Sequence, residues 1–253
     1  MSGHSKWAKI KRKKATTDAA RGRLFTKLIR EITIAARQGG GDPNSNPRLR
    51  TAIEEARAAN MPNENIERAI KRGTGQLDGG QALEEVVYEG YGPNGVALLI
   101  EAVTDNRNRT TSEIKHILSR HNGSLGTQGS VAWQFQTRGI ITIDAKKYDE
   151  DTVLSLALEG GALDVKTEDN TYQVITTPEV FHKVKEIFKN NNIEILSSEI
   201  TKIPQNTIPL NEKDAEKVLK LFEALDELDD VQHVYSNFDI PDEIMEKISN
   251  QGN

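Results

Sequence analysis

The stretch DAARGRLFTKLIREITIAARQ (18–38) organises the first part of the chain. Its apolar residues recur at spacings of three and four, which is the pattern of an amphipathic helix. Asp18 is a candidate N-cap and Gly39 a candidate stop, so we expect a helix over 18–38. Its apolar side carries Leu24, Phe25, Leu28, Ile32, Ala35 and Ala36.

The other side of this predicted helix is cationic. It carries Arg23, Lys27, Arg30 and Arg37. Ile34 falls among these cations, so it is either a contact for a partner or a single exposed apolar residue. We expect this side to face the phosphates of a nucleic acid.

Positive charge is concentrated around this helix. Residues 6–37 contain eleven Lys and Arg but only two acids, although the whole chain carries a net charge of −5. Residues 1–76 hold 17 Lys and Arg against 7 Asp and Glu, whereas residues 77–253 hold 16 against 31, giving net charges of +10 and −15. Such a separation is typical of a surface that attracts phosphate backbones through counterion release. The alternative is a solvated basic tail that binds nothing in particular.

The N-terminal part is expected to form a basic arm and a small helical domain. The arm, 1–17, lacks a clear apolar period, and we expect a partner to order it. In the helical domain, 18–76, a second helix is predicted over 48–59. A third, short helix is predicted to begin at Asn60, with Pro62 in its first turn.

The pattern then changes to that of a mixed α/β domain. The predicted strands are 86–91, 96–104 and 130–135. Between the last two, 104–109 is expected to be a polar loop, and Thr110 with Glu113 forms a capping box for a helix that ends near His121.

The segment 137–206 contains a unit of its own. Its predicted order is strand, helix, strand, strand, helix, strand, the split βαβ pattern of ferredoxin-like domains. The helix and strand predicted after it are too short for a domain but would complete the α/β domain. We therefore predict an α+β protein of three domains: an N-terminal three-helix domain, an α/β domain (81–136 plus 207–240), and an inserted ferredoxin-like βαββαβ domain (137–206).

Two further basic clusters are candidate contacts. Arg68, Lys71 and Arg72 share one helix face, and Arg107 with Arg109 lies between a strand and a helix N-terminus, where free N–H groups favour a phosphate. For the second cluster, an equally good interpretation is that the side chains satisfy the loop itself. The candidate nucleic-acid-binding residues are Lys6, Trp7, Lys9, Lys11, Arg12, Lys13, Lys14, Arg21, Arg23, Lys27, Arg30, Arg68, Lys71, Arg72, Arg107 and Arg109.

Signals for an enzyme are weak. The chain has no cysteine, and its five histidines do not pair at metal-ligand spacing, so no metal, cofactor or catalytic residue is predicted. The segment GYGPNG (90–95) matches a dinucleotide fingerprint only in letters, because a strand rather than a helix follows it. No apolar run approaches the roughly 18 residues of a membrane span, and we expect no secretory signal, because no apolar segment follows the basic residues 6–14. We therefore expect a cytoplasmic protein that is not an enzyme.

Several long runs resemble one known family. They include GHSKWAKIKRKKA (3–15), NMPNENIERAIKRGTG (60–75), YEGYGPNGVA (88–97) and GSLGTQGSVAWQF (123–135). These runs resemble the YebC/PmpR family of bacterial regulators, which has mitochondrial translational-activator relatives. The resemblance implies a three-domain, non-enzymatic, cytoplasmic protein associated with nucleic acid.

Three functions stay open on the sequence. A DNA-binding transcriptional regulator is the usual description of the resembled family. A ribosome- or rRNA-associated translation factor, which the resemblance implies for other members and which would act at difficult, proline-rich sequences, is the second. A basic arm on an acidic body suits docking to a large RNA slightly better than reading a short DNA site. An enzyme with a ligand between domains is the weakest candidate, because no acid, base, nucleophile or metal set stands out.

Overall fold

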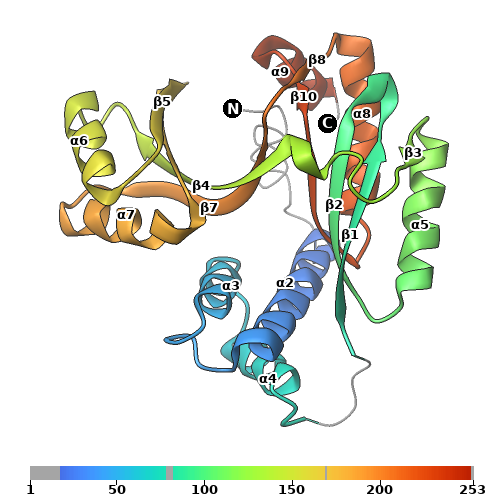
Figure 1. Cartoon of the computed structure of the whole chain (residues 1–253), viewed down its shortest axis with the longest axis horizontal. Helices are drawn as coiled ribbons and strands as arrows, with labels where there is room; N and C mark the ends of the chain where they lie inside the picture. Colours follow the sequence, from blue (N-terminus) through green and yellow to red (C-terminus); the bar gives the residue numbers. More distant parts are fainter. Residues whose placement is uncertain (1–17, 78–81, 169, 252–253) are drawn as a thin grey trace. The chain divides into compact units, whose positions relative to one another are not determined.

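The computed structural model describes residues 18–77, 82–168 and 170–251. Helices and strands are mixed as predicted, and the α+β class is confirmed. The chain forms two compact units, one of residues 133–207 and the other of the remaining described residues (Figure 1). The helical and α/β domains, which the sequence suggests as separate domains, thus pack within one unit.

Three helices form the helical domain: α2 (Asp18–Gly39), α3 (Pro47–Ala58) and α4 (Asn63–Gly73). Helix α3 begins where the Asn46 side chain accepts a hydrogen bond from the Leu49 amide, with Pro47 in the first turn. The apolar stripe of α2 packs on the other two helices. The buried core includes Leu28, Ile32, Ala35, Leu49, Ile53, Ala56 and Ile66.

Helix α4 differs from its prediction at the start. It begins at Asn63 rather than Asn60, because Asn60 takes a left-handed conformation with φ 59° and Pro62 precedes the helix. At its other end, a Cβ on Gly73 would lie 2.3 Å from the Thr33 carbonyl oxygen. Only glycine allows α4 to approach α2 this closely.

The α/β domain is built on an antiparallel sheet of order β3-β1-β2-β9. Its strands are β1 (Glu84–Tyr91), β2 (Ala97–Thr104), β3 (Ser124–Leu125) and β9 (Val231–Ser236). Helices α5 (Arg107–Arg120) and α8 (Glu212–Asp226) share one apolar core with this sheet. Strand β9 follows residues 133–207 in sequence yet pairs with β2, so this sheet is formed from segments on both sides of that unit.

The segment GYGPNG connects β1 to β2 as a tight turn. Pro93–Gly95 forms a single 3-10 turn, and Asn94 has a left-handed φ of 61°. The Gly92 amide donates to the Val96 carbonyl, which closes the turn. This is turn geometry between two antiparallel strands, as the sequence predicts, whereas a dinucleotide fingerprint needs a helix after the glycines.

The prediction for the start of α5 was wrong. The helix begins at Arg107, and its cap is Asn106, whose side chain accepts from the Arg109 amide. Thr110, the predicted cap, is fully buried, and its hydroxyl bonds to Thr104. Arg107 and Arg109 therefore lie in the first helical turn and not in a loop.

The strand predicted over 130–135 was also wrong. Ala132–Gln134 forms a 3-10 turn, and strand β4 begins only at Phe135. The cause is the buried carboxylate of Glu89, which accepts the backbone amides of Gly129, Val131 and Ala132 at 2.6, 2.7 and 2.8 Å. These amides are therefore not available to a neighbouring strand.

The inserted unit has the ferredoxin-like topology that the sequence predicts. Its elements are β4 (Phe135–Asp144), α6 (Glu150–Gly160), β5 (Asp164–Glu168), β6 (Thr171–Thr176), α7 (Pro178–Asn190) and β7 (Ile195–Pro204). The strands pair in the order β5-β6-β4-β7, all antiparallel. Helices α6 and α7 pack side by side over the sheet and share its core (Figure 1).

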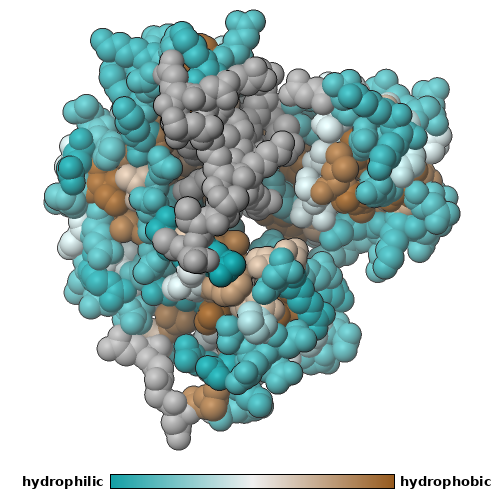
Figure 2. All heavy atoms as spheres, turned by 180° about the vertical axis from the view of Figure 1, so that it is seen from behind, coloured by the Kyte–Doolittle hydropathy of each residue, from teal (hydrophilic) through white to brown (hydrophobic). Residues whose placement is uncertain are grey.

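Short elements complete the unit that contains the helical and α/β domains. Strand β8 (Ile208–Pro209) pairs in parallel with β10 (Phe238–Asp239), and α9 (Asp242–Gln251) follows. The face drawn in Figure 2 is mostly hydrophilic, with apolar side chains in small separate areas. Among the described residues, no helix combines the length and the apolar character that crossing a membrane requires.

Candidate nucleic-acid interface

The seven candidates of the basic arm lie outside the residues that the structure describes. They are Lys6, Trp7, Lys9, Lys11, Arg12, Lys13 and Lys14. The other nine candidates come from three helices, α2, α4 and α5. Their surroundings separate cations that have structural partners from cations that stay available to a ligand.

The cationic side of α2 meets an acidic segment of its own chain. Lys27 Nζ lies 3.0 Å from Asp226 Oδ1 and 2.6 Å from the Asp226 carbonyl oxygen. Arg23 lies 3.4 Å from Glu227. Ile34, on the same side of the helix, is 3% exposed. This side of α2 is therefore largely a packing surface, which corrects the expectation that it faces phosphates.

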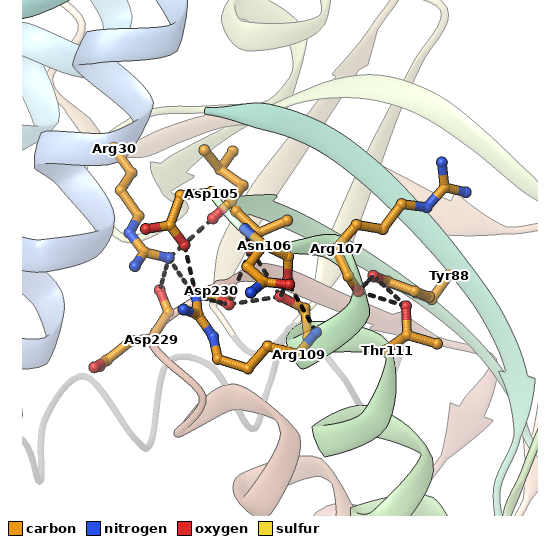
Figure 3. Close-up of polar contacts among 12 residues, drawn as sticks. Arg30, Tyr88, Asp105, Asn106, Arg107, Arg109, Thr111, Asp229 and Asp230 are labelled. Atoms are coloured by element: carbon orange, nitrogen blue, oxygen red, sulfur yellow. Dashed lines mark hydrogen bonds and ion pairs between the residues drawn. The ribbon is translucent and has the colours of Figure 1, made fainter. Parts of the chain in front are cut away.

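Asp230 is the centre of this packing surface (Figure 3). Its carboxylate pairs with Arg30 of α2 and, at 2.7 Å, with Arg109 of α5. It also accepts hydroxyl hydrogen bonds from Thr110 at 2.6 Å and Thr104 at 3.1 Å. One buried carboxylate thus joins helix α2, the end of β2, the start of α5 and the start of β9.

Arg30 contributes more than the ion pair. Its Nη1 also donates to the carbonyl oxygens of Val103 at 2.9 Å and Asp229 at 3.0 Å. Its side chain is only 19% exposed. A phosphate that bound Arg30 would have to replace three acceptors that are already in place, so we exclude Arg30 from the proposed interface.

The two arginines of α5 have different environments. Arg109 bonds to Asp230 and to Asp105, and these bonds raise the pKa of its guanidinium. Arg107, by contrast, points away from this cluster in Figure 3, and no carboxylate of the described part of the chain pairs with it. For Arg109 the structural interpretation therefore holds, whereas Arg107 stays a candidate.

The cluster on α4 is open to solvent. Arg68 is 57% exposed and pairs at 3.0 Å with Glu64 one helical turn away. Lys71 and Arg72 are exposed, and neither has an ion-pair partner within the described ranges. Arg21 is exposed at the start of α2. Lys71 and Arg72 are thus the predicted site residues in the described part that are best placed to reach a ligand.

Two structural residues of this region were missed by the sequence analysis. Asp230 lies about two hundred residues from Arg30, and no short-range pattern connects them. Arg48 of α3 makes a bidentate ion pair with Glu31, at 2.7 and 3.0 Å, and also contacts Glu85. One signal was present: Ile34 among the cations of α2 indicated that this side is covered.

No feature of this region resembles a metal centre. Within the described residues, no group of three or more His, Asp or Glu side chains is arranged to hold a metal ion. The buried carboxylates of Asp230 and Glu89 are saturated by donors from the protein. The candidate ligand-binding groups of this region are therefore its exposed cations and not its buried carboxylates.

Comparison with known protein families agrees with the resemblance in the sequence. Residues 5–76 match the model of the TACO1/YebC protein N-terminal domain, and residues 83–238 match the model of the TACO1/YebC second and third domain. The chain belongs to the TACO1/YebC family.

Individual members of the TACO1/YebC family match nearly the whole chain. A protein of Syntrophus aciditrophicus is 55% identical over 249 residues, which cover 98% of this chain and 100% of the relative. One from Persephonella marina is 56% identical over 251 residues, with the same coverage. Both are named "probable transcriptional regulatory protein".

The crystal structure of a protein with similar sequence identity supports the fold. It is that of a conserved hypothetical protein of Aquifex aeolicus, which is 52% identical. The TM-score is 0.78, and the match covers 90% of this chain and 94% of that one. The α+β fold with an N-terminal helical domain is therefore shared by both proteins.

The Asp230 cluster predicts a specific acid sensitivity. Burial alone would raise the pKa of Asp230, but hydrogen bonds from Thr110, Arg109 and Arg30 outweigh it and lower the pKa from 3.8 to about 2. Because the folded pKa is the lower one, this stabilisation is complete above about pH 4 and is lost as the pH falls towards 2. We expect Asp230 to contribute about 2 kcal/mol to the free energy of unfolding above this range.

The measurement compares the wild type with the Asp230→Asn variant. Chemical denaturation of both at pH 6, 4, 3 and 2.5 gives the free energy of unfolding at each pH. The difference between the two proteins should shrink towards low pH, since protonation removes the same charge as the substitution. A difference that stays constant from pH 6 to 2.5 would show that folding does not lower the pKa of Asp230.

Proposed function

We propose that the protein is a non-enzymatic regulatory protein that binds nucleic acid in the cytoplasm, with DNA as its target. The observation that carries the proposal is the division of charge, +10 in residues 1–76 against −15 in the rest. Within the basic residues 1–76, Lys71 and Arg72 are exposed cations in addition to those of the arm. The names of the relatives, probable transcriptional regulatory proteins, support DNA as the target.

Ribosomal RNA is the alternative target. The net charge of −15 in residues 77–253 repels a long duplex that would wrap the body, whereas an arm can enter a large folded RNA alone. Both targets present the same phosphate chemistry to the cations, so binding in vitro does not separate them. The two targets are separated by where the protein is found in the cell, on the chromosome or on ribosomes.

One experiment on cells distinguishes DNA from ribosomal RNA as the target. A cell lysate is fractionated on a sucrose gradient, and the protein is crosslinked to nucleic acid in intact cells. DNA as the target predicts crosslinks to discrete chromosomal sites and no migration with ribosomes. Migration with ribosomes together with crosslinks to ribosomal RNA would replace DNA by RNA in the proposal. Crosslinks to neither would contradict nucleic-acid binding itself.

The α4 cluster gives a prediction for the purified protein. The Lys71→Gln/Arg72→Gln variant removes two cations from an exposed helix face without disturbing the Arg68–Glu64 pair. We expect the slope of log affinity against log salt to flatten by about 2, and the affinity for duplex DNA to fall about tenfold. Fluorescence anisotropy with labelled DNA over a range of KCl concentrations measures both.

The matched control is the Lys183→Gln/Lys189→Gln variant. Both lysines are exposed on α7 of the inserted unit, so the change in total charge is the same. This control should keep the wild-type slope. Equal slopes for all three proteins would remove α4 from the interface.

A further inference from the structure

A stretch without acidic residues begins in helix α5, within the otherwise acidic half of the chain. Residues 77–253 contain 31 acids, yet none lies between Glu113 and Asp144, a stretch of thirty residues. The average density of acids in this half would place about five there. The acid-free stretch begins inside α5, whose only acid is Glu113 and whose cations are Arg107, Arg109, Lys115 and Arg120.

The outward side of α5 carries the cations that the fold does not use. Ile114 and Leu118 are fully buried against the sheet and define the inward side. The opposite side, here called the α5 face, consists of Ser112, Lys115, Ser119 and Arg120, all exposed. In the described part of the chain, neither cation of this face has an ion-pair partner, unlike Arg109 in the first turn.

The spacing on the α5 face suits an extended polyanion. Lys115 and Arg120 are five residues apart, so they flank the central line of the face at an angle of about 140° to each other. The two serines lie between them, and hydroxyl groups are common ligands of nucleic-acid phosphates. Residues 112–120 rise about 12 Å along the helix, a distance over which one strand of a duplex presents three to four phosphates.

We infer that the α5 face is a second contact surface for the phosphate backbone of nucleic acid, separate from the α4 cluster. The inference rests on the proposed function, since it names a further part of the same interface. We expect the contribution of the α5 face to be affinity and orientation rather than sequence preference, because its lysine and two serines are typical phosphate contacts. Arg107, which points away from the Asp230 cluster, is a further exposed cation in the first turn of α5, outside the α5 face.

The test uses the Lys115→Gln/Arg120→Gln variant of the full chain. Both positions are exposed, so the variant should fold, and an unchanged unfolding midpoint checks this. Binding to a 24-base-pair DNA duplex and to an RNA hairpin of equal length is measured over a series of KCl concentrations. We expect the salt slope to flatten by about 2 and the affinity to fall about tenfold, equally for unrelated sequences.

The control is Lys213→Gln/Lys220→Gln on α8, which removes two exposed cations from the same domain. The control should bind like the wild type.

If Lys71→Gln/Arg72→Gln weakens binding but Lys115→Gln/Arg120→Gln does not, the inference is wrong and the proposed function stands. If the wild type shows no salt-dependent binding, both are wrong. If the α5 variant loses binding to polyglutamate but keeps that to DNA and RNA, the face recognises an acidic protein and the inference is wrong.

Discussion

Replacing Lys11, Arg12, Lys13 and Lys14 together by glutamine is expected to weaken nucleic-acid binding on the order of a hundredfold at about 0.1 M salt. These four consecutive cations form the densest positive charge in the chain. Each phosphate that a cation neutralises releases condensed counterions and contributes about 0.9 to the slope of log affinity against log salt for a duplex. Removing all four cations should therefore flatten this slope by about 3 to 4.

The result must be separated from a general effect of net charge. The variant Lys183→Gln/Lys189→Gln/Lys213→Gln/Lys220→Gln removes the same four charges from exposed positions on α7 and α8. It should bind with the wild-type slope, because screening over a Debye length of about 10 Å makes distant charges count little. If the arm variant kept the wild-type affinity and slope, the arm would be a solvated tail, and the proposed function would lose its main support.

The arm and the body are linked through helix α2. The arm ends where α2 begins, at Asp18, and the acidic segment 226–230 holds the cationic side of that helix. These contacts fix the first described helix, the one that directly follows the arm in sequence. Cations of α2 that were predicted to bind phosphate instead pair with carboxylates of the same chain.

Local pattern was sufficient for much of the fold. The period of three and four in α2, and the strand and helix order of the inserted unit, each depend on residues close together in sequence. The prediction of the start of α5 failed because it depends on a residue that is distant in sequence. Thr110 has the sequence of a cap, but Asp230, distant in sequence, accepts its hydroxyl and leaves capping to Asn106.

The same limit applies to the candidate site. Sequence can show that Arg30, Lys71 and Arg107 lie on predicted polar surfaces, but it cannot show which of them meets a carboxylate from another element. Arg30 does and the other two do not, among the residues that the structure describes. Contacts over two hundred residues carry no periodic signal, so only the folded arrangement separates structural cations from available ones.

Removing the central carboxylate should have the largest effect on stability. In Asp230→Ala, the buried hydroxyls of Thr104 and Thr110 lose their acceptor, and two arginines lose an ion pair. Breaking a buried pair in this way costs about 3 to 5 kcal/mol. Arg109 is 42% exposed and can be rehydrated, so we expect the lower end, about 3 kcal/mol. Chemical denaturation followed by circular dichroism measures this decrease in stability.

Asp105→Asn provides the matched control, because it removes an exposed carboxylate from the same Arg109. Its cost should not exceed about 0.5 kcal/mol, as for other surface ion pairs. Hydrogen exchange localises the effect: in Asp230→Ala, the amides of α2 and of the first turn of α5 should exchange faster, whereas α6 and α7, in the other unit, should not change. Equal stability of the two variants, or faster exchange throughout the chain, would show that Asp230 does not hold α2 in place.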